Sequence, residues 1–369
     1  MREEAKVAIV GGGIAACSLA YHLARLGWDD VVLLEQDELT SGSTWHAAGL
    51  CTQFNSSYTL MRLLRYSVEL YRSLEAETGQ PVNYHACGSL RLAATRDRLD
   101  EFRQRAAMAE LVGVPFEFVG TERLAGLNPL LDTRGLLEAA YLPTDGHVDP
   151  TGLTTAFVRG ASDLRVRRRT PVTAIRRERG SWLLETPVGH VRAEIVVNAA
   201  GQWAPAVARL VGGDLPLVSL QHHYVVTEPI AELAALEREL PVLRDADASS
   251  YVRQEGGGLL VGPFERDRSR GCSTASRRAS TAGCSSCGVC GRRWERSSLR
   301  WAVREFEEHD CPAGEAARTR RAVKAAEREI ACEACGWVAV TDKYRGPALL
   351  AEHQRIGPNK ADAAEPASG

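Results

Sequence analysis

Residues 6–16 read Lys-Val-Ala-Ile-Val-Gly-Gly-Gly-Ile-Ala-Ala, and this stretch decides the fold. Its apolar half predicts a buried parallel strand, and the three glycines predict a tight turn at the end of that strand. Small and apolar residues then recur with a helical period up to Gly27, and a second apolar run covers residues 31–35. Strand, glycine turn, helix and strand together predict one right-handed crossover unit of an α/β sheet.

The glycine turn carries the pattern Gly11-x-Gly13-x-x-Ala16, and Glu35 ends the second predicted strand. Gly11 allows the tight turn, Gly13 lets backbone N–H groups approach a pyrophosphate, and the small Ala16 lets helix and strand pack closely. The helix N-terminus adds its positive dipole end, and Glu35 can accept hydrogen bonds from ribose hydroxyls. The pattern predicts a site for FAD or NAD, and the acid at the strand end argues against NADP. The alternative is a structural turn without a ligand.

The bulk composition limits the class of protein. The chain has 369 residues, a formal net charge of -2 and 44% apolar residues, which suits two domains or one large one. A charge so close to neutral favours neither a nucleic-acid nor a membrane partner. Apolar runs stay shorter than the roughly 20 residues of a membrane helix. The N-terminus carries no targeting signal, so we expect a cytoplasmic protein.

A second stretch identifies the cofactor. Residues 41–50 read Ser-Gly-Ser-Thr-Trp-His-Ala-Ala-Gly-Leu. With the glycine turn and Glu35, this stretch resembles the sarcosine and dimethylglycine dehydrogenase family, FAD-dependent amine oxidoreductases of the D-amino acid oxidase-like superfamily. The resemblance implies that a ring nitrogen of His46 is bonded to the 8α carbon of FAD, with Ser43 and Thr44 among the cofactor contacts. The alternative is a histidine held by the backbone of a turn and bonded to nothing.

The resemblance extends over about residues 5–267. The further motifs that carry it are residues 141–150, 196–203, 221–228, 243–253 and 259–265. It implies an α/β fold (α+β overall), in which a Rossmann-like FAD-binding domain (1–80 and 146–215) is interleaved with an antiparallel-sheet substrate domain (81–145 and 216–267). It also implies that Val172 lies at the adenine, and that Ala200 and Gly201 lie near the pyrophosphate. An ordinary strand-to-helix turn is the alternative for the last two residues.

Apolar periodicity predicts two helices, over residues 57–77 and about residues 97–111. The first helix has one face that carries Leu60, Leu63, Leu64, Val68 and Leu74.

The family reaction sets the requirements for a substrate site. A secondary or tertiary N-methyl amine, such as sarcosine or dimethylglycine, loses hydride to the flavin, and water hydrolyses the iminium to formaldehyde and the demethylated amine. Oxygen or an electron-transfer protein then accepts the electrons. The amine must be unprotonated, so the site needs a proton acceptor, together with a cation for the substrate carboxylate.

The candidates for that site alternate along two predicted strands, so that His222 and Tyr224 share one face, as do Tyr251 and Arg253. His222 can accept the proton, and both tyrosines can wall the pocket. Arg253 can pair with a carboxylate. The alternative is that these four are ordinary sheet residues, since tyrosine is common in strands.

The segment after Asp267 departs from the family. Cys272, Cys284, Cys287, Cys290, Cys311, Cys332 and Cys335 crowd it, and residues 268–301 are rich in Arg, Ser, Cys and Gly. Three interpretations compete for residues 268–369: a zinc or iron–sulfur site, a disordered extension, or an out-of-frame translation. We favour the third because the segment lacks hydrophobic periodicity, and we assign no metal ligands.

The third interpretation has a consequence for function. We expect the C-terminal completion of the FAD domain to be missing. A truncated, inactive homologue is then one alternative to an active enzyme, and a protein that binds metal through its C-terminal cysteines is another.

Overall fold

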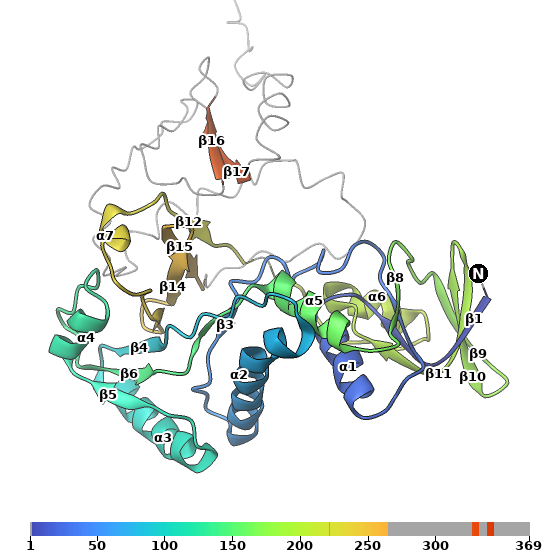
Figure 1. Ribbon diagram of the computed structural model, residues 1–369, viewed down its shortest axis with the longest axis horizontal. Coiled ribbons are helices and arrows are strands. Elements are labelled where there is room, and N and C mark those ends of the chain that lie inside the picture. The colour runs from blue at the N-terminus through green and yellow to red at the C-terminus, as the bar shows by residue number, and fades with distance from the viewer. Residues whose placement is uncertain (1, 221, 265–326, 332–337, 343–369) are drawn as a thin grey trace, which may run out of the picture.

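The computed structural model describes residues 2–220 and 222–264 and two further strands, at residues 327–331 and 338–342. Two sheets lie side by side, with helix α2 (Tyr58–Thr78) between them (Figure 1). The predicted α/β fold with a second, largely antiparallel sheet is confirmed.

The first sheet has the glycine-turn strand at its centre. Its six strands are, in spatial order, β8 (Arg165–Arg167), β2 (Val31–Leu34), β1 (Arg2–Val10), β11 (Gly189–Asn198), β10 (Ser181–Thr186) and β9 (Ala174–Glu178). The first four are parallel, and the last two continue the sheet as an antiparallel ribbon. Because parallel strands end on the same edge, the residues after β1, β2 and β11 must meet there.

Two helices cover one face of this sheet, α1 (Ile14–Arg25) and α5 (Pro150–Gly160). They bury Tyr21 and Phe157 against each other in the core beneath β1 and β2. The 3₁₀ turn η1 (Gly201–Trp203) and helix α6 (Ala204–Arg209) follow β11. Helix α1 and turn η1 therefore begin at the edge of the sheet where the glycine turn lies.

The second sheet has seven strands. In spatial order they are β12 (Val225–Val226), β15 (Gly258–Pro263), β14 (Ser250–Glu255), β13 (Val242–Asp245), β4 (Ser89–Ala93), β6 (Glu138–Leu142) and β5 (Glu117–Val119). All neighbours are antiparallel except β4 and β13. One face buries a leucine-rich core that includes Leu90, Leu243 and Val252. The opposite face therefore carries the alternate residues of these strands.

Three helices belong to this half, α3 (Arg96–Val112), α4 (Thr121–Leu127) and α7 (Ala231–Ala234). A two-stranded ribbon joins the halves, with β3 (Leu50–Cys51) antiparallel to β7 (Gly146–His147). The chain thus passes between the two sheets more than once. The predicted domain boundaries stay a prediction.

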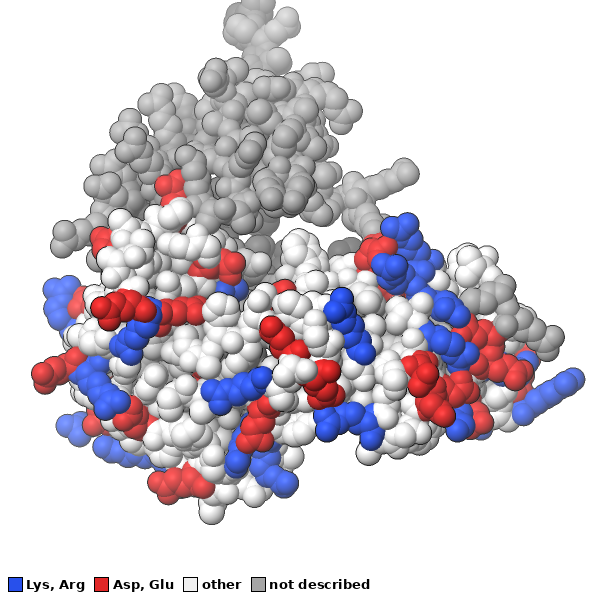
Figure 2. Space-filling view, in the orientation of Figure 1, with Lys and Arg blue, Asp and Glu red and all other residues white. Residues whose placement is uncertain are grey.

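Acidic and basic side chains are interspersed on the face shown in Figure 2. Within the described ranges, no helix is both long and apolar enough to cross a bilayer. Strands β16 (Glu327–Ala331) and β17 (Val338–Asp342) pair antiparallel. The predictions for the cysteines after Asp267 lie outside the described residues.

Candidate functional site

The glycine turn lies where three strands end. Gly11 has a φ of +117°, and a Cβ there would stand 2.4 Å from the carbonyl oxygen of Ala199, which follows β11. A Cβ on Gly12 would stand 2.9 Å from the Cβ of Glu35. Only glycine fits such contacts, so the turn brings the backbone close to the ends of β2 and β11.

Glu35 faces this turn with a buried carboxylate. One oxygen accepts a hydrogen bond of 2.6 Å from the N–H of Gly12, and the other accepts 2.8 Å from the N–H of Asp37. Burial raises the pKa of the Glu35 carboxyl, and the bonds from Asp37 and Gly12 offset part of that rise. A carboxylate oxygen accepts more than one hydrogen bond, so Glu35 can still receive a ribose hydroxyl.

Helix α1 begins without a side-chain cap on Gly13. The Oγ1 atom of Thr44 accepts the N–H of Ile14 at 3.1 Å, and a Cβ on Gly13 would stand 3.1 Å from that same oxygen. Thr44 therefore supports the helix start, while Ala16 is fully buried behind it. The first turn of a helix offers N–H groups without intrahelical acceptors, which suits an anionic ligand.

The remaining predicted cofactor residues gather at the same edge. Thr170 donates its N–H to the carbonyl of Glu35 at 2.7 Å, and this contact brings Val172 to the end of β2. Val172 and Ala200 pack in one apolar cluster, and Gly201 begins η1 with a φ of +54°. Their contacts with adenine and pyrophosphate stay predictions.

The segment between Thr40 and His46 folds as consecutive turns beside α1. Thr40 has a φ of +67°, which is costly for a β-branched residue and marks local strain. The exposed His46 ring lies 3.9 Å from the ring of Trp45, centroid to centroid, and Ser43 is also exposed. The His46 imidazole is thus exposed on the segment whose Thr44 contacts the start of α1.

Three of the four predicted catalytic residues come together beside the second sheet. The prediction that His222 and Tyr224 alternate along a strand is wrong, because both lie in the loop before β12. The His222 Nε2 atom lies 3.3 Å from the Tyr251 hydroxyl, and the Phe264 ring stacks on His222 at 5.2 Å. Tyr224 packs against the apolar cluster that contains Tyr251. A Cβ on Gly262 would stand 2.0 Å from the Tyr251 ring, so only glycine leaves room for it. The glycine inside strand β15 is the signal that the sequence offered for this close approach.

Arg253 is buried and already engaged by protein groups. Its Nε donates to the carbonyl of Ala48 at 2.7 Å, and one Nη donates to the carbonyl of Gln254 at 2.7 Å and pairs with Glu255 at 2.5 Å. It therefore joins the second sheet to the segment that carries His46. The pairing of Arg253 with the substrate carboxylate stays a prediction.

A cluster that sequence reasoning missed joins His85, His147 and Glu239. The carboxylate accepts from the His85 Nδ1 at 2.7 Å and from the His147 Nε2 at 2.5 Å. The three ligand atoms lie within 4.8 Å of one another, which is the donor set of a divalent metal site. No short sequence motif marks it, because His85 and Glu239 lie in loops before β4 and β13, far apart in the chain.

Three cysteines fall within the described residues, Cys17, Cys51 and Cys87, and all are free thiols. Burial raises the pKa of each to about 12, so they stay protonated at neutral pH. They are consequently poor nucleophiles and poor metal ligands.

Together, the glycine turn, the buried Glu35 and the start of α1, where Thr44 accepts the N–H of Ile14, define a dinucleotide-binding protein of the α/β class. The absence of side chains at Gly11 and Gly13 leaves the backbone open to a pyrophosphate, and Glu35 stands at the ribose position. These residues fit an FAD molecule.

Comparisons with known proteins agree with this class. The family model described as FAD dependent oxidoreductase matches residues 6–355, and the chain belongs to this family. It is 48% identical to the mitochondrial dimethylglycine dehydrogenase of Rattus norvegicus over 267 residues, which is 72% of this chain and 31% of that protein. It is 39% identical to the mitochondrial sarcosine dehydrogenase of Homo sapiens over 274 residues, 71% of this chain and 29% of that protein.

A solved structure gives the same result for the fold. The L-proline dehydrogenase of P. horikoshii superposes with a TM-score of 0.64 and 26% identity, covering 71% of this chain and 70% of that chain. The chain spans about a third of the length of the curated relatives it matches. The resemblance to the sarcosine and dimethylglycine dehydrogenases is therefore confirmed for this part of their length.

Proposed function

We propose that this chain holds FAD, bonded covalently to His46, and oxidises an N-methylated secondary or tertiary amine of the sarcosine or dimethylglycine type. The observation that carries the proposal is the position of His46, exposed on the turn segment that also caps α1 through Thr44. The similarity to dimethylglycine dehydrogenase over 72% of the chain supports the same assignment.

The residues of the first half would hold the cofactor along its length. Glu35 accepts the ribose hydroxyls, and the start of α1 with Gly13 receives the pyrophosphate. Val172 lies at the end of β2, where the adenine would lie, and Ala200 with Gly201 borders the pyrophosphate from the other side. A covalent bond from a His46 ring nitrogen to the flavin would prevent the loss of FAD.

When bound, the flavin accepts hydride from the substrate carbon next to nitrogen. The chain's own part is to present an unprotonated amine. His222 and Tyr251 form a hydrogen-bonded pair at 3.3 Å, and a His222 ring nitrogen can accept the ammonium proton. Tyr224 and Phe264 pack around the pair, and the His222 ring stays exposed. The resulting iminium hydrolyses to formaldehyde and the demethylated amine.

We also propose that oxygen or an electron-transfer protein accepts the electrons from the flavin. We further propose that the protein lies in the cytoplasm. A regulatory protein without catalysis is a second candidate. It is favoured by 36% identity over 269 residues to the pyruvate dehydrogenase phosphatase regulatory subunit of Mus musculus.

The test is to denature the purified protein in acid and to record flavin fluorescence on the polypeptide. We expect flavin to remain bound to the wild-type chain, to be lost from the polypeptide in His46→Ala, and to remain in His190→Ala, a histidine on β11. If acid releases the flavin from the wild-type chain, the flavin is bound without a covalent bond to His46. A chain with no flavin at all would contradict the proposed activity and favour the regulatory candidate.

A further inference from the structure

Two histidines from distant parts of the chain face each other across a single β-bridge. The N–H of His85 donates to the carbonyl of His147 at 2.9 Å, and the N–H of His147 donates to the carbonyl of His85 at 3.1 Å. Residues paired in this way carry their side chains on the same face. The two rings accordingly stack, with centroids 4.6 Å apart and planes inclined by 15°. The backbone itself therefore holds the two imidazoles together.

The residue before His147 makes this close pairing possible. A Cβ on Gly146 would stand 1.8 Å from the carbonyl oxygen of His85, so only glycine lets the two segments approach so closely. The same segment also pairs with β3, where His147 lies opposite Leu50. His147 is thus held by pairing with two segments, and only 7% of its side chain is exposed.

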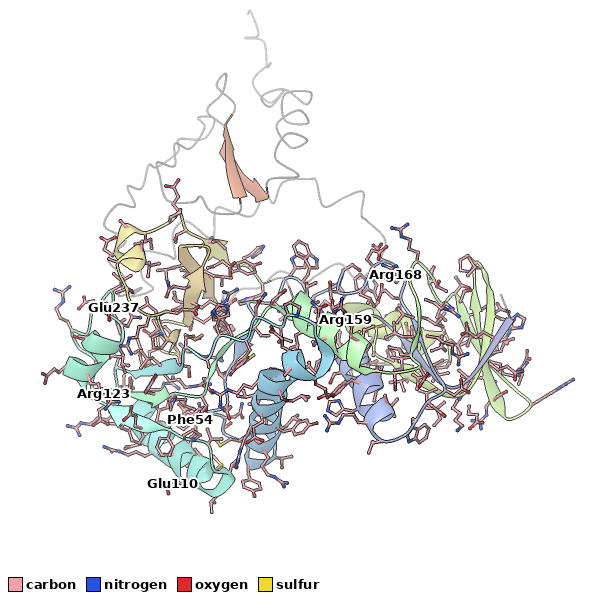
Figure 3. All side chains as sticks on the ribbon, in the orientation of Figure 1. Phe54, Glu110, Arg123, Arg159, Arg168 and Glu237 are labelled. Carbon is pink, nitrogen blue, oxygen red and sulfur yellow. The ribbon has the colours of Figure 1, made fainter. Side chains whose placement is uncertain are left out.

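Glu239 adds a third donor from the second sheet. It lies in the loop between α7 and β13, two residues after Glu237, which Figure 3 labels. The N–H of Val242 donates to the carbonyl of Gly88 at 2.9 Å, and this bond ties the end of the loop to the segment that carries His85. The carboxylate therefore reaches the two histidines on a segment that is itself anchored.

The three side chains direct their donor atoms toward one another. The Glu239 oxygens lie 2.7 Å from the His85 Nδ1 and 2.5 Å from the His147 Nε2, and the three ligand atoms lie within 4.8 Å of one another. Zinc binds imidazole nitrogen and carboxylate oxygen at about 2.0–2.2 Å, so such ligands lie roughly 3.3 Å apart around it. Small rotations of the side chains would therefore admit an ion between them.

The charge of Glu239 is not offset by a lysine or an arginine of the described part of the chain. Its ion pairs there are with the two histidines alone, although 26% of its side chain is exposed. Arg238, its neighbour in the sequence, instead donates to the carbonyl of Gly126 at 2.8 Å. A partly buried carboxylate of this kind is a suitable ligand for a cation.

We propose that His85, His147 and Glu239 form a zinc site. Imidazole nitrogen suits zinc and its transition-metal neighbours, whereas magnesium and calcium prefer a shell of oxygen atoms. Three protein ligands leave a fourth position for water, and the 48% exposed side chain of His85 provides a path from solvent. The coordinating nitrogens must carry no proton, so zinc displaces the protons that they share with Glu239 to the other ring nitrogens or to solvent.

The ion would join three segments that connect the two halves of the molecule. His147 belongs to β7, Glu239 precedes β13, and His85 precedes β4. The strand paired with β7 is β3, which begins at Leu50, four residues after His46. Zinc would therefore stabilise the position of the His46 segment relative to the second sheet. This role is structural, and it requires neither flavin nor the proposed amine oxidation.

The test must separate this site from the cysteines that follow Asp267. The purified full chain is treated with iodoacetamide, which alkylates accessible thiols, and then with a chelator that is removed by dialysis. Zinc binding is measured by calorimetry and by thermal unfolding. Cobalt serves as the spectroscopic probe, because thiolate ligands give a strong charge-transfer band that nitrogen and oxygen ligands do not give.

Two variants remove one ligand each. His85→Ala removes the half-exposed imidazole, and Glu239→Gln keeps the shape of the side chain but removes its charge. His190→Ala is the matched control, because His190 lies on β11 of the first sheet. Thermal unfolding of each metal-free variant shows that it is folded before zinc is added.

We expect one zinc ion per chain in the wild type and in His190→Ala, with a higher melting temperature. Each ligand variant should bind zinc about 100-fold more weakly, since loss of a group that only supports a ligand already costs about 10- to 100-fold. Zinc should also slow hydrogen exchange at residues 49–51 in the wild type and not in His85→Ala. Magnesium should have neither effect.

The proposal is overturned if the alkylated wild type binds no zinc, or if both ligand variants bind it within about twofold of the wild type. A thiolate band in the cobalt spectrum of the alkylated chain would assign the ion to cysteines and would equally overturn it. Zinc binding that is weakened in both ligand variants and retained in His190→Ala supports the site, whether or not the preparation contains flavin.

Discussion

Glu239 forms hydrogen bonds with two histidines that are far from it in the sequence, His85 and His147. Its two carboxylate oxygens accept hydrogen bonds from a nitrogen of the His85 ring and a nitrogen of the His147 ring, and the two rings stack with centroids 4.6 Å apart. Burial by itself raises the pKa of Glu239, but the hydrogen bonds from His147 and His85 outweigh burial and lower it overall. A carboxyl with a lowered pKa stabilises the folded state when it is ionised.

Glu239→Gln should therefore destabilise the protein in a pH-dependent way. The contribution is present above the unfolded pKa, about 4.3, and is lost as pH falls through the lower pKa of the folded state. We expect a loss of about 2 kcal/mol in the free energy of unfolding at pH 7. The difference from wild type should shrink as pH falls below about 4.

Urea unfolding between pH 3 and pH 7 measures this difference. Glu237→Gln is the control, since Glu237 is an exposed neighbour (Figure 3). A difference between Glu239→Gln and wild type that stays constant across this pH range would show that Glu239 does not titrate as described.

At the scale of single residues, the sequence predicted the local part of the site and missed the distant part. Gly11, Gly13 and Glu35 were predictable because one crossover unit positions all of them. Glu239 gives no such signal, because it is brought to His85 only through the pairing of β4 with β13. The pairing of distant strands is a tertiary property that a local pattern does not contain.

At the scale of elements, helix α5 shows how a boundary is fixed. The Asp149 carboxylate accepts the N–H groups of Thr151 at 2.9 Å and Gly152 at 3.0 Å, and Pro150 occupies the first turn. An N-cap acid satisfies donors that the helix cannot satisfy itself. The start of α5 also follows directly on the ribbon that joins the two halves.

Asp149→Ala should lower the free energy of unfolding by about 1 kcal/mol, because two N–H groups lose their acceptor. Asp149→Asn should lie close to wild type, since asparagine caps helices about as well as aspartate. Thermal unfolding of the three proteins checks this. Equal losses for alanine and asparagine would indicate that the charge matters and not the cap.

The long amphipathic elements were the easiest to predict. The helices expected over residues 57–77 and about 97–111 are confirmed as α2 (Tyr58–Thr78) and α3 (Arg96–Val112). Each ends at a glycine in the left-handed conformation, Gly79 and Gly113. The sequence did not predict that the antiparallel strands β10 and β9 extend the parallel sheet. Alternation of apolar and polar residues indicates a strand but does not show which strand pairs with it.

At the scale of the whole molecule, Arg253 couples the two sheets. It belongs to β14 of the second sheet, and its Nε reaches the carbonyl of Ala48 in the segment that follows His46. The apolar cluster around Tyr251 meets Ala48 and Leu50 at the same place. The position of His46 relative to the second sheet therefore depends on this contact.

Arg253→Met should keep the apolar stem and lose the hydrogen bonds. We expect a loss of about 2 kcal/mol in stability, and faster hydrogen exchange at residues 46–50. Arg176→Met is the control, because Arg176 and its partner Glu185 lie within one exposed ribbon. Unchanged exchange at residues 46–50 in Arg253→Met would argue against this coupling.

The pairing of β1 with β11 has a consequence for the way the chain is made. Strand β1 precedes its two neighbours in the sequence and lies between β2 and β11, with Val10 in register with Asn198. At about 5–20 residues per second, its second neighbour is synthesised some ten to forty seconds later. Throughout that interval an apolar strand edge waits without its partner, so a nascent chain of this protein should depend on chaperones that shield such edges.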